Sequence, residues 1–320
     1  MSTAARPVEL SVVVPVYQEE QTLPMFFTRI RPVLESITPD YEIIFVVDPG
    51  RDRTEDLLRA EAAKDDRVRV LLMTRRWGQP ACTAAGLEHS RGKAVVPIDV
   101  DLQDPPELIQ AMYAKWLEGY EVVMAQRISR KGETLPKRVV SYVGYWIIDR
   151  IADVPIPRNT GDFRLLDRRV VQALGTLRET HGFLRGLVAF VGYKQCTIPY
   201  ERDERKGGRS KYSQITGSLR IGLNGIVAFS SKPLTLATVF GFACAGLSVL
   251  TGLAYVIRLV VLGRGMMTGL APIMLMVTFL GGVQLICFGI MGEYIGRIYE
   301  EVRQRPKYMV ATKLNFPDNT

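Results

Sequence analysis

The sequence predicts an α/β domain on a mainly parallel β-sheet, followed by a hairpin of two transmembrane helices. Over residues 9–125, apolar runs rich in β-branched residues alternate with helical patterns. Such an alternation is typical of a parallel sheet that helices cover on both faces. Two later runs, 234–257 and 266–292, contain no charged residue. Each exceeds the length of about 20 residues that a helix needs to cross a bilayer.

The strands and helices of the first domain are expected to alternate strictly. Strands are expected at 9–17, 41–48, 68–74, 93–101 and 121–127. Helices are expected between them, at about 21–36, 54–65, 80–90 and 105–119. Ligands of open parallel sheets bind beyond the carboxyl ends of the strands. The polar residues that follow each strand are therefore the candidates for a functional site.

Three polar clusters follow the first, second and fourth expected strands. They are PVYQEE at 15–20, Asp48 with Asp52 nearby, and DVDLQ at 99–103. No GxGxxG follows the first strand and the sequence contains no GxxxxGK[ST]. The dinucleotide-binding and P-loop interpretations therefore lose most of their support.

The third cluster predicts a metal site. Side chains alternate along an extended segment, so Asp99, Asp101 and Gln103 are expected to point to one side. Two carboxylates and an amide oxygen suit Mg²⁺ or Mn²⁺, which accept one or two carboxylates and leave positions for phosphates and water. We therefore expect a divalent ion that holds a diphosphate. Asp104, just before two prolines, is expected to cap the next helix.

Composition favours a membrane surface over nucleic acid as the partner. The formal net charge is +8, with 47% hydrophobic and 23% charged residues. The basic residues become denser after residue 200, beside the apolar runs. The four cysteines form no CxxC pair, which argues against a zinc site or a disulfide framework. The first ten residues lack the apolar segment of a cleaved signal peptide.

The basic residues around the hairpin predict its orientation. The turn carries Arg258 and Arg264, whereas more arginines and lysines flank the outer ends of the two runs. The positive-inside rule then places both termini in the cytoplasm. Residues 218–231 have apolar residues at near-helical spacing and are either an interfacial helix or a plain connector. Glycines recurring at 281–296 permit close packing within the hairpin or between subunits.

The order of these motifs resembles the polyprenyl-phosphate glycosyltransferases of family 2, which have the GT-A fold. The resemblance rests on PVYQEE, VVDPGRD, DVDLQDPPE, TGDFRLLDRRV, GGRSKYS and MGEYIGRIYEEVRQRPKY. It covers residues 9–309 and is strongest to the dolichyl-phosphate mannose synthase group and its bacterial undecaprenyl-phosphate relatives. It implies four parts: a cytoplasmic GT-A catalytic domain at 1–215, a juxtamembrane segment at 216–232, two transmembrane helices within 233–297 (about 234–260 and 266–292), and a cytoplasmic tail at 298–320.

The resemblance also implies a site for the nucleotide-sugar donor. Pro15, Tyr17 and Glu19 would line the nucleoside pocket, and Asp48 would contact the base. Asp99 would lie near the ribose and diphosphate, with Asp101 and Gln103 as ligands of Mg²⁺ or Mn²⁺. This chain has Val47-Asp48-Pro49-Gly50 where the family usually has DDGS. The base and the donor specificity therefore stay open.

A lipid phosphate would attack the anomeric carbon of the donor and would need cations to hold it there. The candidates are Arg127, Arg138, Ser141, Arg205, Arg209 and Lys211. Arginine's fork suits phosphate oxygens; a surface charge or an anchor to anionic lipid is the alternative for each cation. Asp162, in TGDFR, would orient the acceptor or a basic residue, or accept a proton; a turn residue is its alternative. The expected catalytic groups are Asp99, Asp101, Asp162 and Arg127.

The resemblance implies an inverting transfer from a UDP-sugar to undecaprenyl phosphate at the inner membrane of a bacterium. The sugar is open, and a homo-oligomer such as a tetramer is expected. A processive polysaccharide synthase is the nearest alternative, but it would need more membrane helices and a QxxRW motif after the acids. A catalytically silent scaffold would be expected to lose the acids or RSKYS, and both are present. Two helices give a transporter no obvious pathway.

Overall fold

The computed structural model describes residues 7–128, 160–177, 184–201, 232–262 and 271–316. The chain divides into two compact units. The first contains a β-sheet with its helices and takes in the C-terminal residues 306–320. The second contains the two long helices. Each unit is described by itself.

Every strand and helix that the sequence predicts up to residue 127 is present in the first unit. Its elements are β1 (Leu10–Val16), α1 (Leu23–Ile37), β2 (Tyr41–Val47), α2 (Thr54–Lys64), β3 (Val68–Met73), α3 (Gln79–His89), β4 (Ala94–Pro97), α4 (Leu108–Leu117), β5 (Val122–Arg127), β6 (Thr160–Asp167), α6 (Arg168–Thr176), α7 (Leu184–Phe190), β7 (Gln195–Tyr200) and β8 (Val310–Leu314).

The sheet has the order β7-β5-β6-β4-β1-β2-β3-β8. Strands β1 to β4 pair in parallel where they are neighbours, and β5 pairs in parallel with β7. Strand β6 lies antiparallel between β4 and β5, and β8 lies antiparallel at the edge beside β3. Because β6 is antiparallel to both of its neighbours, β5 runs in the same direction as β4 and β1. Strand β7, which is parallel to β5, also runs in this direction. The carboxyl ends of most strands therefore share one edge of the sheet.

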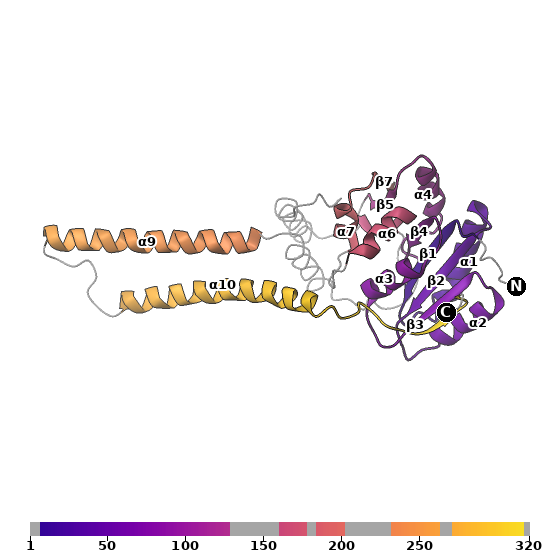
Figure 1. Ribbon diagram of the computed structural model, residues 1–320, viewed down its shortest axis with the longest axis horizontal. Helices are drawn as coiled ribbons and strands as arrows, with labels where there is room; N and C mark the ends of the chain where they lie inside the picture. The colour runs from indigo at the N-terminus through magenta and orange to yellow at the C-terminus, as the bar shows by residue number, and fades with distance from the viewer. Residues whose placement is uncertain (1–6, 129–159, 178–183, 202–231, 263–270, 317–320) are drawn as a thin grey trace. The chain divides into compact units, whose positions relative to one another are not determined.

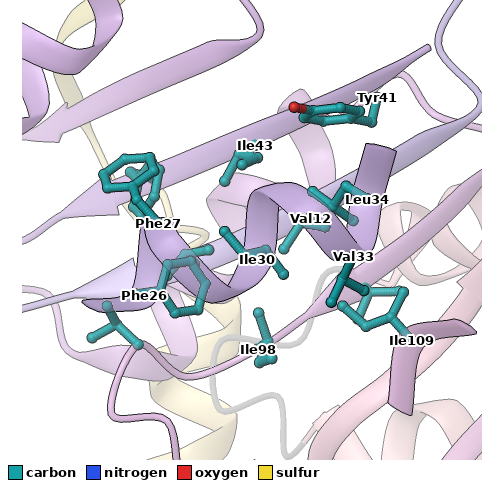
Figure 2. Packing of buried hydrophobic residues seen from close by; sticks show 14 of the residues in the cluster. Val12, Phe26, Phe27, Ile30, Val33, Leu34, Tyr41, Ile43, Ile98 and Ile109 are labelled. Carbon is teal, nitrogen blue, oxygen red and sulfur yellow. The ribbon is translucent and has the colours of Figure 1, made fainter. Parts of the chain in front are cut away.

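Both faces of the sheet are buried, which explains the continuous apolar strands. On one face Val12 packs with Phe26 and Ile30 of α1 and with Ile109 of α4, as Figure 2 shows. On the other face Val13 belongs to a separate cluster that includes residues of α3 and α6. Alternate residues of β1 thus serve two cores, as expected for a parallel sheet between helical layers.

Helix α4 begins three residues later than its sequence pattern predicts. Its N-cap is Glu107, with no side-chain cap hydrogen bond. The prediction that Asp104 caps this helix is therefore wrong. The two prolines instead form the preceding turn, in which the carbonyl of Pro105 accepts from the Leu108 amide. Asp104 instead accepts a hydrogen bond from the hydroxyl of Tyr200.

The C-terminal segment returns to the first unit and adds β8, a strand that the sequence did not predict. Asn315 follows β8 with a φ of 60°, in the left-handed region. Its side-chain amide donates to the carbonyls of Ala62 at 2.6 Å and Val68 at 2.9 Å. The segment therefore covers the edge of β3 and caps the C-terminal end of α2.

The second unit consists of α9 (Lys232–Leu262) and α10 (Ala271–Val302), which fit the predicted hairpin (Figure 1). Leu234–Ala254 and Met276–Val302 are long and apolar enough to cross a membrane, and none of their most apolar stretch is buried within the structure. Phe242, for example, is 76% exposed. Helix α10 extends ten residues beyond its expected end at 292, where Arg297 and Glu293 form an ion pair one turn apart. The segment 216–231 lies outside the described residues.

Candidate active site

The loop after β4 presents its acids on one side. Burial alternates along it: Val100 and Leu102 are buried, whereas Asp99, Asp101 and Gln103 are partly exposed. Leu102 has a φ of 58°, a left-handed conformation that non-glycine residues rarely adopt. The amide of Gln103 donates to Asp101 Oδ1 at 3.1 Å. The loop is thus a tight turn that points two carboxylates and an amide towards solvent.

Asp48, after β2, holds the start of α3. Its two carboxylate oxygens accept from the amides of Trp77 at 3.0 Å and Gly78 at 2.8 Å. Gly78 has a φ of 88°, which favours glycine. The next residue, Gln79, donates its side-chain amide to Asp99 Oδ1 at 2.6 Å. Gln79 was missed in the sequence, although its place just after β3, at the ligand-binding edge of the sheet, is a signal for it.

The loop after β1 is fastened to the loop after β2. The amide of Glu19 donates to Thr54 Oγ1 at 2.8 Å, and the Glu19 carboxylate accepts from Thr22 at 2.9 Å. A Cβ on Gly50 would lie 2.8 Å from Gln18 Cγ, so a larger residue there would displace the Gln18 side chain. Pro15 lies within β1, and the guanidinium of Arg76 stands 4.0 Å from the centre of the Tyr17 ring. The predicted nucleoside residues therefore cluster around the ends of β1 and β2.

Arg127 ends β5 and meets Tyr200, which ends β7. Its Nε donates to the Tyr200 hydroxyl at 3.1 Å, and that hydroxyl donates to Asp104. Burial would lower the pKa of Arg127, but the bond to Tyr200 and the charge of Asp104 raise it. Asp99 also raises this pKa through its charge. Arg127 therefore stays charged and lies within the field of the acidic loop.

Asp162, on β6, is held by two arginines. Arg185 of α7 donates to its Oδ1 at 2.9 Å, and Arg164 lies 3.9 Å from the same oxygen. Burial would raise the pKa of Asp162, but these charges outweigh burial and lower it. Arg164 is 1% exposed, and burial lowers its pKa to about 10. A carboxylate with a lowered pKa is a weak base and a good partner for cations.

The match to a family model decides the identity. Residues 11–175, which include every site residue described so far except Arg185 and Tyr200, match the model described as "Glycosyl transferase family 2". The chain is a family 2 glycosyltransferase. Its sheet, with antiparallel β6 between β4 and β5, is the GT-A-like fold that the resemblance implied.

The glycosyltransferase has curated relatives along almost its whole length. It is 40% identical to an uncharacterized glycosyltransferase of Bacillus subtilis, over 96% of this chain and 94% of the relative. It is 39% identical to the bactoprenol glucosyl transferase of Shigella phage SfX, over 95% and 99% respectively. It is 36% identical to a prophage bactoprenol glucosyl transferase homolog of Escherichia coli, over 94% and 98%. These alignments must span both units, because neither unit alone makes up 94% of the chain.

The glycosyltransferase presents its predicted site residues in two groups. Asp48, Asp99, Asp101 and Gln103 lie on the loops after β2 and β4, and Arg127 and Asp162 lie on β5 and β6. Within the described residues, no group of three His, Cys, Asp or Glu side chains stands ready to hold a metal. Five predicted residues lie outside the described ranges: Arg138, Ser141, Arg205, Arg209 and Lys211.

Proposed function

We propose that this glycosyltransferase transfers a hexosyl or related sugar from a UDP-sugar to a polyprenyl phosphate, undecaprenyl phosphate in a bacterium. One observation carries the proposal: the likeness to bactoprenol glucosyl transferases covers 95% of this chain. It therefore includes the acidic loop, the arginines of β5 and β6, and both apolar helices. A transferase that met only soluble substrates would have no use for such a hairpin.

The acidic loop fits a divalent ion. Asp99, Asp101 and Gln103 supply hard oxygen donors from one partly exposed side of a single turn. Mg²⁺ and Mn²⁺ need only one or two carboxylates when phosphates and water complete the shell, so a third acid is not required. The metal, when bound, would neutralise charge on the leaving nucleoside diphosphate. Asp101 and Gln103 would be its ligands, with Asp99 close to the ribose and diphosphate.

The nucleoside would bind over the ends of β1 and β2. Pro15, Tyr17 and Glu19 belong to the loop that is tied to Thr54, which gives the pocket a fixed wall. Asp48 has both oxygens on backbone amides, yet a carboxylate has about four lone-pair positions and can accept another donor from a base. Its first task is to hold the start of α3, which in turn sets Gln79 against Asp99.

The acceptor phosphate is already anionic near neutral pH and needs positive charge more than a base. Arg127 would hold its oxygens at the end of β5. Asp162 would orient Arg185 and Arg164 rather than take a proton, because its pKa is lowered. Arg138, Ser141, Arg205, Arg209 and Lys211 are proposed to add to the same phosphate site. Attack from the side opposite the diphosphate would invert the anomeric centre.

The hairpin would keep the catalytic domain beside the lipid headgroups of the inner membrane. Both termini would then be cytoplasmic, with the domain boundaries at 215, 232 and 297 as the sequence predicts. The active form is proposed to be a homo-oligomer. The glycines of α10 leave room for another helix to approach closely, since a Cβ at Gly281, Gly289 or Gly296 would meet nothing within 4 Å among the described atoms of one chain.

A donor screen tests the function. Full-length protein in detergent is given undecaprenyl phosphate, Mn²⁺ or Mg²⁺, and each nucleotide sugar in turn, and mass spectrometry reads the lipid product. We expect a UDP-sugar to give a lipid-phosphate-linked sugar, and chelator or the double variant Asp99→Ala/Asp101→Ala to lower the rate by about 1000-fold. Asp66→Ala, at an exposed acid beyond α2, is the matched control and should leave the rate unchanged.

Two outcomes would overturn the proposal. One is transfer to water or to a soluble sugar acceptor with no lipid product from any donor. The other is an undiminished rate for the double variant in chelator. NMR of the product checks the stereochemistry, and retention of the anomeric configuration would contradict the inverting attack.

A further inference from the structure

We propose that Tyr200 and Asp104 are positioning residues, which together fix the guanidinium of Arg127 for the acceptor phosphate. The inference rests on the proposed function, because it assumes that Arg127 binds the acceptor. It gives a positioning role to two side chains that the sequence analysis did not assign to the acceptor site. Asp104 was expected to cap a helix, and Tyr200 was not singled out in the sequence.

The register of the sheet brings the three side chains together. Arg127 and Tyr200 are paired neighbours in the parallel ladder of β5 and β7. Asp104 reaches them from the loop that precedes α4. The Tyr200 ring also meets the edge of Phe163 on β6, with ring centres 6.4 Å apart. Three strands and one loop therefore determine where the tyrosine hydroxyl lies.

The hydrogen bonds run in one direction. The Tyr200 hydroxyl accepts from Arg127 Nε at 3.1 Å and donates its own proton to Asp104. Tyr200 is 6% exposed and Asp104 is 3% exposed, so water competes little for either bond. Burial, with the charge of Asp104, raises the pKa of Tyr200 to about 12. The hydroxyl therefore stays protonated near neutral pH and keeps this direction.

The contact is made through the inner nitrogen of the arginine. A bond through Nε fixes the plane of the fork and does not consume the two terminal nitrogens, the edge that suits two phosphate oxygens. Arg127 Nη2 lies 3.8 Å from Asp104 Oδ1, too far for a hydrogen bond but close enough for charge attraction. Tyr200 and Asp104 therefore orient the guanidinium without forming a hydrogen-bonded salt bridge with it.

Asp104 also links the two substrates. It lies three residues after Asp101, in the loop proposed to hold the metal and the diphosphate. A single loop would thus set both the donor's leaving group and, through Tyr200, the cation for the attacking phosphate. Positioning by a shared loop keeps the two reacting groups in register, where errors of 1 Å can cost about 100-fold in rate.

The test is Tyr200→Phe in full-length protein, assayed with the active donor of the screen and undecaprenyl phosphate. We expect kcat/KM for the acceptor to fall about 10-fold, as for loss of a hydrogen bond to a charged group, with the donor KM unchanged. In an Arg127→Ala background the same change should have no further effect. Asp104→Asn, which keeps an oxygen acceptor but removes the charge, should give a smaller loss of the same kind.

Tyr113→Phe is the matched control, because Tyr113 donates to Glu9 at 3.1 Å near the opposite ends of the strands. It should leave both kinetic constants unchanged, and thermal unfolding shows that each variant is folded. The positioning role is overturned if Tyr200→Phe behaves like Tyr113→Phe, if both substrates suffer equally, or if the losses from Tyr200→Phe and Arg127→Ala simply add. If Arg127→Ala itself leaves the acceptor constants unchanged, the acceptor site proposed for Arg127 fails as well.

Discussion

The sheet has two halves that stabilise their carboxylates through different groups. The first half contains β4, β1, β2 and β3, and the second half contains β6, β5 and β7. In the first half, backbone amides and a side-chain amide do so: Asp48 accepts from Trp77 and Gly78, and Asp99 accepts from Gln79. In the second half, arginines do so: Asp162 faces Arg185 and Arg164. Amides fix an acid without cancelling its charge, whereas arginines cancel it.

This contrast gives the two halves opposite electrostatic characters at one edge of the sheet. The first half stays acidic, which suits a cation and the donor diphosphate that the cation would hold. The second half joins Arg127, Arg164 and Arg185 to Asp104 and Asp162, a surplus of one positive charge among these five groups. That surplus suits an anionic acceptor. A reaction between two anions needs such a division of charge.

The largest effect on this division of charge is expected for Asp162→Asn, which changes the second half of the sheet, here called the acceptor half. Arg164, 1% exposed, would lose its counter-charge, and Arg185 would keep an oxygen acceptor but lose the negative charge that it now faces. We expect kcat/KM for the acceptor to fall about 100-fold, the loss that a misplacement of about 1 Å can cause. The donor KM should stay within about twofold. Steady-state kinetics with each substrate varied in turn measures the two constants.

The outcome for the donor decides what Asp162 does. An equal rise in the donor KM would place Asp162 with the donor half and remove the division between the halves. A pH profile adds a second criterion. Because the pKa of Asp162 is lowered, its carboxylate is ionised near neutral pH, so we expect no rise of the wild-type rate there that the variant loses. Such a rise would require a raised pKa and would favour a general base over an orienting residue.

A smaller effect is expected for Asp48→Ala, which removes an acid from the first half of the sheet, here called the donor half. The amides of Trp77 and Gly78 would lose their buried acceptor, and Gln79 would no longer be set against Asp99. We expect the donor KM to rise about 30-fold and the free energy of unfolding to fall by about 2–3 kcal/mol. Steady-state kinetics with the donor varied and denaturant unfolding measure these quantities. Asp48→Asn, which keeps one acceptor oxygen, should lose less, and a raised acceptor KM in either variant would contradict the division.

The sequence predicted the first half better than the second for a physical reason. Each βα unit up to β5 is local: an apolar run, a loop and a helix pattern follow one another, so the periodicity alone places Asp48 and Asp99 at the same edge. Tyr200 and Arg185 meet their partners across 73 and 23 residues of chain respectively. No local pattern records such pairs. The pairing of β8 with β3 was hidden for the same reason.

Asp104 illustrates a different limit of the sequence. An aspartate before Pro-Pro and a helix pattern satisfies every local rule for an N-cap. The turn made by the prolines moves the start of α4 to Leu108, and Asp104 is then close enough to bind Tyr200. Local preference was overruled by a long-range partner, and only the fold shows that partner.

The smallest effect is expected for Gly161→Ala on β6, which tests how closely the position of Arg127 is fixed. A Cβ there would lie 3.0 Å from Arg127 Nη2 and 3.7 Å from its Cζ, so the guanidinium must shift by a few tenths of an ångström. We expect kcat/KM for the acceptor to fall about threefold, since displacements well under 1 Å cost correspondingly less than 100-fold, and the donor KM to stay the same. Gly175→Ala on α6 is the matched control, because its Cβ would meet nothing within 4 Å.

The control should leave both constants unchanged and raise the free energy of unfolding by about 0.5 kcal/mol, the usual gain for alanine over glycine in a helix. The two variants add the same methyl group, so a difference between them reports where Arg127 must stand and not the cost of the methyl. If Gly161→Ala matches the control in acceptor kinetics, Arg127 tolerates displacement, and the acceptor half would act as a diffuse positive field and not as a fitted site.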